Sequence, residues 1–187
     1  NLDRIAGVYG NGIVAIQAGQ DVNLNAAQVV NSAAPQDSLT VITAGRDVNM
    51  GTVTTNYAYK SGDATNFDDN RLKQDVGSVV ISQGDVALQA GRDINAKAAT
   101  INVYPAEASG EGGSTQGAVD LQAKRDINIT AGQASSYNEY ARKDTQSDMF
   151  SSTTSITHLK NEQTQAIASN IEGKTVSVRA GQDINVK

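Results

Sequence analysis

The stretch Ala90-Gly91-Arg92-Asp93-Ile94-Asn95 decides the fold of this chain, because close copies of it occur four more times. The other copies begin at Ala18, Ala44, Ala123 and Ala180, and each ends on an Asn five residues later. A phrase that recurs in this way indicates one structural unit stacked along an axis. The 187-residue chain is therefore interpreted as an array before any single motif is considered.

Apolar and polar side chains alternate on both sides of each copy. Around the third copy, Val86 and Leu88 precede it and Ile94 and Ala96 follow at every second residue. The equivalent positions of the other copies are also apolar, with Thr40 as the exception. A period of two on both sides of a short corner is typical of strand, turn and strand, each strand burying one face.

A third, weaker apolar stretch follows the early copies and is expected to close the cross-section. It lies at Val29–Val30, at Val53 and at Ile101–Val103. Three short strands per repeat predict an all-β fold, a right-handed parallel β-helix in which like residues stack in columns. Coils would be about 4.8 Å apart, the spacing of hydrogen-bonded strands.

The distances between successive copies differ widely, which predicts insertions between coils. We expect residues 1–187 to be one β-helical segment of a longer chain, with insertions at about 57–77, 107–116 and 137–173. The last of these is rich in Ser and Thr, and Phe150–Ile171 has many β-branched residues, so it is predicted to form a protruding β-hairpin. Asn161–Ala168 is assigned as a helical alternative within it.

The corner residues have three predicted structural roles. Glycines supply a positive φ at the bend, at Gly19, Gly45, Gly91 and Gly181. Aspartates accept hydrogen bonds from backbone amides freed at the bend, at Asp21, Asp47, Asp93, Asp126 and Asp183. Asparagines form a ladder of stacked side-chain amides, at Asn23, Asn49, Asn95, Asn128 and Asn185. At the fourth corner Lys124 replaces the Gly, which predicts either a different bend or a left-handed residue there.

Arg46, Arg92 and Arg125 occupy equivalent positions on the three middle corners. Solvated pairing with neighbouring Asp residues is one interpretation. The other is a basic stripe that binds a polyanion such as a sulfated glycan or a lipopolysaccharide phosphate. A net charge of −5 argues against nucleic acid as the partner.

The composition offers little for catalysis or for metal binding. There is no Cys, and His158 is the only histidine, assigned to an exposed loop. One Asp per coil does not meet the nonapeptide spacing of calcium repeats. A polysaccharide-active β-helix is the enzymatic alternative, with Asp120 and Asp126 as its carboxylates. We expect no catalytic residue, cofactor or metal site, and no run approaches the roughly 18 apolar residues of a membrane helix.

The five copies between alternating strands resemble the haemagglutinin repeat of filamentous-haemagglutinin-type exoproteins. A second similarity lies in Met149–Thr157 and Ala168–Val186, which resemble the later repeat block of contact-dependent growth inhibition effectors. Lys124 departs from the pattern, and neither the secretion domain nor a toxin domain of that family is present in these residues.

The resemblance implies a non-enzymatic filament segment, secreted to the surface of a Gram-negative bacterium through an outer-membrane two-partner secretion transporter. In the growth-inhibition branch the segment would be a stalk or translocation region for delivering a toxin to neighbouring bacteria, and its partner would be the target's outer membrane or a receptor. In the adhesin branch it would bind host glycans or receptors.

Overall fold

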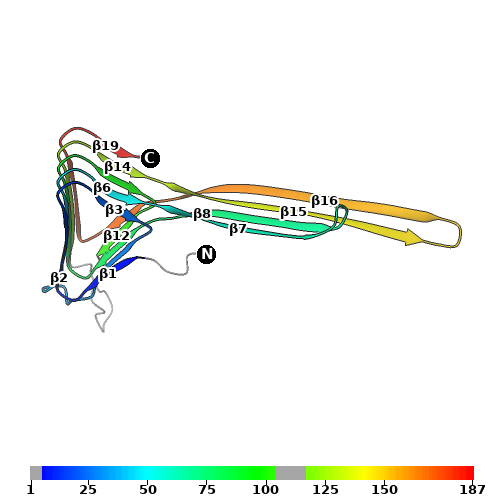
Figure 1. Cartoon of the computed structure of the whole chain (residues 1–187), viewed down its shortest axis with the longest axis horizontal. Coiled ribbons are helices and arrows are strands. Elements are labelled where there is room, and N and C mark those ends of the chain that lie inside the picture. The colour runs from blue at the N-terminus through cyan, green and yellow to red at the C-terminus, as the bar shows by residue number, and fades with distance from the viewer. Residues whose placement is uncertain (1–5, 104–116) are drawn as a thin grey trace. The chain divides into compact units, whose positions relative to one another are not determined.

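The computed structural model describes residues 6–103 and 117–187, which form two compact units. The larger unit consists of residues up to Val53, Val76–Gly132 and Ile167–Lys187. It is the parallel β-helix predicted from the repeat, with three parallel sheets that each contain one strand from every coil (Figure 1). None of the described residues forms a helix long and apolar enough to cross a membrane.

Each sheet takes its strands in the order of the coils. Sheet A contains β1 (Gly7–Gly10), β4 (Gln28–Asn31), β9 (Val79–Ser82), β12 (Thr100–Val103) and β17 (Asn170–Glu172). Sheet B contains β2 (Ile13–Ala18), β5 (Leu39–Ala44), β10 (Asp85–Ala90), β13 (Ala118–Ala123) and β18 (Thr175–Ala180). Sheet C contains β3 (Val22–Asn25), β6 (Val48–Gly51), β11 (Ile94–Lys97), β14 (Ile127–Thr130) and β19 (Ile184–Val186).

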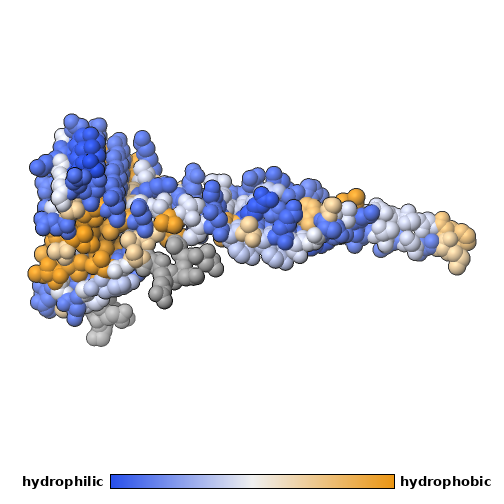
Figure 2. Space-filling view, viewed as in Figure 1, coloured by the Kyte–Doolittle hydropathy of each residue, from blue (hydrophilic) through white to orange (hydrophobic). Residues whose placement is uncertain are grey.

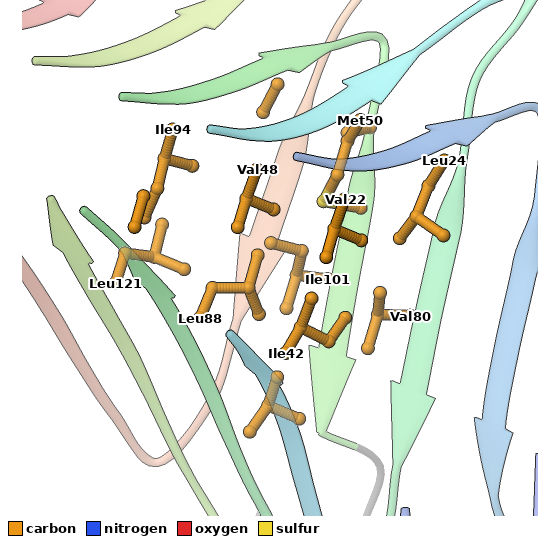
Figure 3. Packing of buried hydrophobic residues seen from close by; sticks show 14 of the residues in the cluster. Val22, Leu24, Ile42, Val48, Met50, Val80, Leu88, Ile94, Ile101 and Leu121 are labelled. Atoms are coloured by element: carbon orange, nitrogen blue, oxygen red, sulfur yellow. The ribbon is translucent and has the colours of Figure 1, made fainter. Parts of the chain in front are cut away.

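The core consists of columns of apolar residues held in register by strand pairing. On sheet B, Ile42 pairs with Leu88 and Leu88 pairs with Leu121, and all three side chains are 0% exposed. Val48 and Ile94 stack in the same way on sheet C, and these columns face one another across the interior (Figure 3). Because one coil cannot cover its own apolar face, neighbouring coils supply most of the burial.

The one polar residue in the predicted apolar pattern, Thr40, is fully buried and satisfied. Its hydroxyl donates to Ser82 Oγ at 3.4 Å and accepts from Asn31 Nδ2 at 3.3 Å. Ser38 extends this cluster with a 2.9 Å hydrogen bond to Ser82. A buried hydroxyl costs little when its hydrogen bonds are made within the protein, so Thr40 is tolerated in the column.

The corner glycines do not have the positive φ predicted for them. Among the described residues that conformation belongs to Gly12 and Gly62, and to Ala26 and Ala98. What requires glycine at the corners is close stacking, because a Cβ on Gly91 would overlap the carbonyl oxygen of Gly45 one coil away. Lys124 is not left-handed either, and its amide still donates to Ala90 O, at 3.2 Å.

The second unit contains Thr54–Asp75 and Gln133–Ala166 and is built on one sheet, called sheet D. Sheet D has the strand order β7 (Val53–Gly62), β8 (Phe67–Val76), β15 (Gly132–Ser147) and β16 (Ser152–Ile167). β7 follows sheet C of the second coil and β15 follows sheet C of the fourth coil. The order of strands in sheet D therefore repeats the order of the coils to which they are connected.

Two expectations about the insertions and the third strand differ from the structure. Residues 161–168 are not helical, since they lie almost wholly in strand β16, whose β-branched residues favour an extended chain. Val53 does not close the second coil. It begins β7, and the next strand of sheet A is β9. The loop expected at 107–116 lies outside the described residues.

Candidate functional site

The three arginines of the predicted polyanion stripe form bidentate ion pairs with aspartates of the preceding coil. Arg46 Nε lies 2.7 Å from Asp21 Oδ1, and Nη2 contacts the other carboxylate oxygen. Arg92 binds Asp47 in the same way, with its Nε at 2.8 Å. Figure 2 shows a dense hydrophilic surface on the β-helix.

Arg125 completes this row, with its Nε 2.7 Å from Asp93 Oδ1 and its second contact through Nη2. Arg125 Nε also lies 3.3 Å from Asp126, its own neighbour in sequence. The surface is thus an alternating row of acids and bases, in which forked guanidinium geometry meets carboxylates. Polyanion binding by Arg46, Arg92 and Arg125 stays a prediction, and a ligand would compete with these pairs.

The motif aspartates cap amides of the next coil. Asp21 Oδ1 accepts the amide of Asp47 at 3.2 Å, and Asp47 Oδ1 accepts the amide of Asp93 at 3.2 Å. Asp126 and Asp183 continue the pattern. The aspartates therefore accept amide hydrogen bonds as predicted, but the amides belong to the next coil. These bonds hold successive corners together.

This arrangement stabilises the ionised carboxylates. The pKa of Asp21 is lowered, above all because its carboxylate accepts a hydrogen bond from Arg46. The pKa of Asp47 is lowered chiefly by Arg92, against the opposing effect of its burial. Hydrogen bonds to Asp21, Asp47 and Asp93 in turn raise the pKa of the three arginines.

The lowered pKa values predict a loss of stability in acid. A carboxylate whose pKa is lower in the folded chain stabilises the fold above its unfolded value of about 3.9, and this contribution disappears as pH falls through the folded value. We expect the thermal midpoint, measured by circular dichroism, to be level between pH 7 and about pH 5 and to fall by several degrees below about pH 4. In Asp47→Asn the midpoint at neutral pH should be lower and its dependence on acid weaker. An unchanged acid dependence in that variant would contradict the role of Asp47.

The asparagines form an unbroken ladder along sheet C. Asn49 Nδ2 donates to Asn23 Oδ1 at 2.8 Å, and the same bond is repeated between successive coils up to Asn185. Each interior amide donates to one coil and accepts from the other. Such in-register amide stacking fixes the register of identical strands.

On sheet D, a cluster of polar and aromatic side chains joins β15 to β16. His158 Nε2 lies 2.7 Å from Glu139 Oε1, and the Tyr137 hydroxyl donates to the other oxygen of Glu139. These two hydrogen bonds lower the pKa of Glu139, and the one from Tyr137 has the larger effect. The hydrogen bond to the Glu139 carboxylate in turn raises the pKa of Tyr137. His158, expected in a loop, is therefore on a strand and has a partner.

Beside this cluster sheet D has a shallow hollow of about 390 Å³. Its lining includes Arg71, Lys73, Ser135 and Tyr137. Arg71 is bound to Asp69 and lies over the Tyr137 ring, 5.0 Å from its centre. The lining also includes Glu162, so the hollow brings together two cations, one carboxylate and an aromatic ring, a combination suited to a hydroxyl-rich group.

The carboxylates of the enzymatic alternative are both engaged in contacts between coils. Asp120 accepts a 3.0 Å hydrogen bond from Arg179, and Asp126 Oδ1 accepts the amide of Asp183 at 3.2 Å. No group of three or more His, Cys, Asp or Glu residues that could hold a metal ion occurs in the part of the chain that the structure describes. The arrangement of these residues supports stacking of the coils.

Inference from the sequence missed the partner of each arginine. Because Arg and Asp are adjacent in the three middle corners, pairing within the corner was expected, whereas the carboxylate of the preceding coil is closer to each guanidinium. The signal was present in the repeat itself, since parallel in-register stacking places Arg of one coil next to Asp of another. The cluster of Tyr137, Glu139 and His158 left no comparable signal, because it depends on the register of the hairpin.

Comparison with known proteins gives one match. The family model described as the hemagglutinin repeat matches residues 4–112, more than half of the chain. No curated protein and no solved structure matches this chain.

Proposed function

The chain belongs to the hemagglutinin repeat family, the structural, filamentous-haemagglutinin type of secreted cell-surface exoprotein, and from this premise we propose that it is a stalk segment in contact-dependent toxin delivery. Its role would be to carry a contact element to a neighbouring bacterium, after export through an outer-membrane two-partner secretion transporter. The segment itself would be non-catalytic.

The observation that carries this proposal is the tip of the β15–β16 hairpin. Met149 and Phe150, between the two strands, are 90% and 96% exposed. Figure 2 shows apolar surface at the far end of the hairpin. Two large apolar side chains so exposed at a tight turn are unfavourable in water and suited to an apolar partner. The similarity of Met149–Thr157 and Ala168–Val186 to the later repeat block of growth-inhibition effectors further supports this branch.

The test replaces both tip residues in the exoprotein that contains this chain. In Met149→Ser/Phe150→Ser, we expect inhibition of target bacteria in co-culture to fall at least about tenfold, because the lost apolar contacts are each worth about 1.5 kcal/mol or more when buried. Ile13→Ser, which removes an exposed apolar side chain from the β-helix, is the matched control. Equal surface display is checked with an antibody. Undiminished inhibition by the double variant would refute the proposal.

Adhesion to host glycans or receptors is the second candidate. It is favoured by the hollow on sheet D, whose lining combines Tyr137 with Arg71 and Lys73. Sugars that carry carboxylate or sulfate groups suit such a combination. In this case host-cell binding, rather than inhibition of bacteria, would be the activity that depends on the exoprotein.

A further inference from the structure

Strand β16 presents a long, unpaired edge. It is the outer strand of sheet D, with β15 on one side, and 15 of its 16 residues are exposed, all except Ile167. In the described residues no strand pairs with its other side. A strand edge of this length offers a row of backbone donors and acceptors to another chain.

The hydrogen bonding of the hairpin shows which residues point their backbone groups outward. The Asp148 amide donates to Ser151 O at the turn, so odd-numbered residues of β16 face β15. By the alternation of antiparallel strands, the even-numbered residues, among them Lys160 and Glu162, direct their N–H and C=O groups to the free edge. Their side chains lie on one face of sheet D, since Lys160 Nζ is 3.6 Å from Glu162 Oε2.

The edge lacks most of the features that block pairing. Natural edges are protected by proline, by bulges, by shortness or by several lysines. β16 has 16 residues and no proline, and its ionisable residues are His158, Lys160 and Glu162. The two opposite charges neutralise one another, so the strand does not repel an identical strand.

We propose that β16 pairs antiparallel with β16 of a second copy of this chain, about a two-fold axis at Asn161. This register places Lys160 opposite Glu162 of the other copy, twice by symmetry, and turns the charge pair of each strand into a complementary cluster of four. The pairing uses the even-numbered residues, whose backbone groups point outward. Sheet D of one copy then continues into sheet D of the other.

The position of the two-fold axis at Asn161 can be tested with an introduced cysteine. Asn161 faces its own counterpart at a non-hydrogen-bonded position, where Cα atoms are about 4.5 Å apart. Two side-chain amides can bond there, as they do in the Asn ladder of sheet C. A disulfide also fits that separation, and because the chain has no Cys, a single introduced Cys can form one only with another copy.

The first experiment uses charge reversal and analytical ultracentrifugation of the 187-residue chain. We expect the unmodified chain to dimerise, and Lys160→Glu or Glu162→Lys alone to weaken the dimer about tenfold or more, because like charges then lie opposite one another. An equimolar mixture of the two variants should dimerise again, since each Glu then meets a Lys. This rescue excludes misfolding of the variants as the cause.

The second experiment locates the axis. Under mild oxidation Asn161→Cys should form a covalent dimer, whereas Ser155→Cys, which would lie opposite Ile167, should not. A monomer at all concentrations would overturn the proposal. So would a dimer that is insensitive to charge reversal and in which Cys at 161 does not crosslink, because association would then run through another surface such as the open sheets of the β-helix.

Discussion

Replacing Leu88 by Ala is expected to lower the free energy of unfolding by about 3 to 4 kcal/mol. Leu88 is fully buried in the middle of the sheet B column, between Ile42 and Leu121. Truncation removes apolar burial and leaves a cavity that these neighbours cannot fill, because their strands are held at the coil spacing. Urea unfolding followed by circular dichroism measures the loss.

Ile16→Ala is the matched control, because Ile16 occupies the same column on the first coil and is only partly buried. This variant should lower the free energy of unfolding by about 1 to 2 kcal/mol, since burial of the removed atoms is incomplete. Equal losses in the two variants would contradict the view that stability comes from contacts between coils.

Replacing Gly91 by Ala has the second largest expected effect, a loss of about 2 to 3 kcal/mol. The added methyl group would overlap the backbone carbonyl of Gly45, and backbone in a hydrogen-bonded stack cannot rotate away as a side chain can. The corner must shift, which lengthens bonds such as that from the Gly91 amide to Ala44 O, now 3.0 Å. The measurement is again the urea midpoint.

Gly19→Ala is the control for this variant. Gly19 has the same place on the first coil, but nothing lies within 4 Å of its added Cβ. Its stability should change by no more than about 0.5 kcal/mol. Lys124 indicates how the stack adjusts to a Cβ. The hydrogen bond from its backbone N–H to Ala90 O is 3.2 Å long, and the equivalent hydrogen bonds of Gly45 and Gly91 are shorter. A loss as large in Gly19→Ala as in Gly91→Ala would show that steric contact is not the reason for glycine.

The parallel β-helix could be predicted because its information is local and repeated. Alternation around Leu88 and Ile94 defines two strands, and five copies of the corner define the stacking. The third strand was harder to place, and Val53 was assigned wrongly, because the chain leaves the coil at that residue for β7. An insertion breaks the relation between distance in sequence and position in the coil.

The residues of the corner were identified from the sequence, but the physical reason for two of them was not. Gly91 was interpreted through its own backbone angles, whereas the limit is a contact with another coil. Asp47 was interpreted as a cap on its own turn, whereas it binds Arg92 and the Asp93 amide. In both cases the decisive partner is some 45 residues away in sequence, so a local pattern could not reveal it.

The direction of the bonds between coils has a mechanical consequence. The backbone hydrogen bonds, the Asn side-chain hydrogen bonds and the Arg–Asp ion pairs all join one coil to the next. A force that pulls the two ends of the β-helix apart therefore acts along these bonds. We expect it to peel the terminal coil away residue by residue rather than to break a whole sheet at once. A 26-residue coil, the length from Asp21 to Asp47, occupies about 4.8 Å when folded and about 86 Å when extended. Under load such a stack would lengthen coil by coil, about eighteenfold for each coil, and would so limit the force that it transmits.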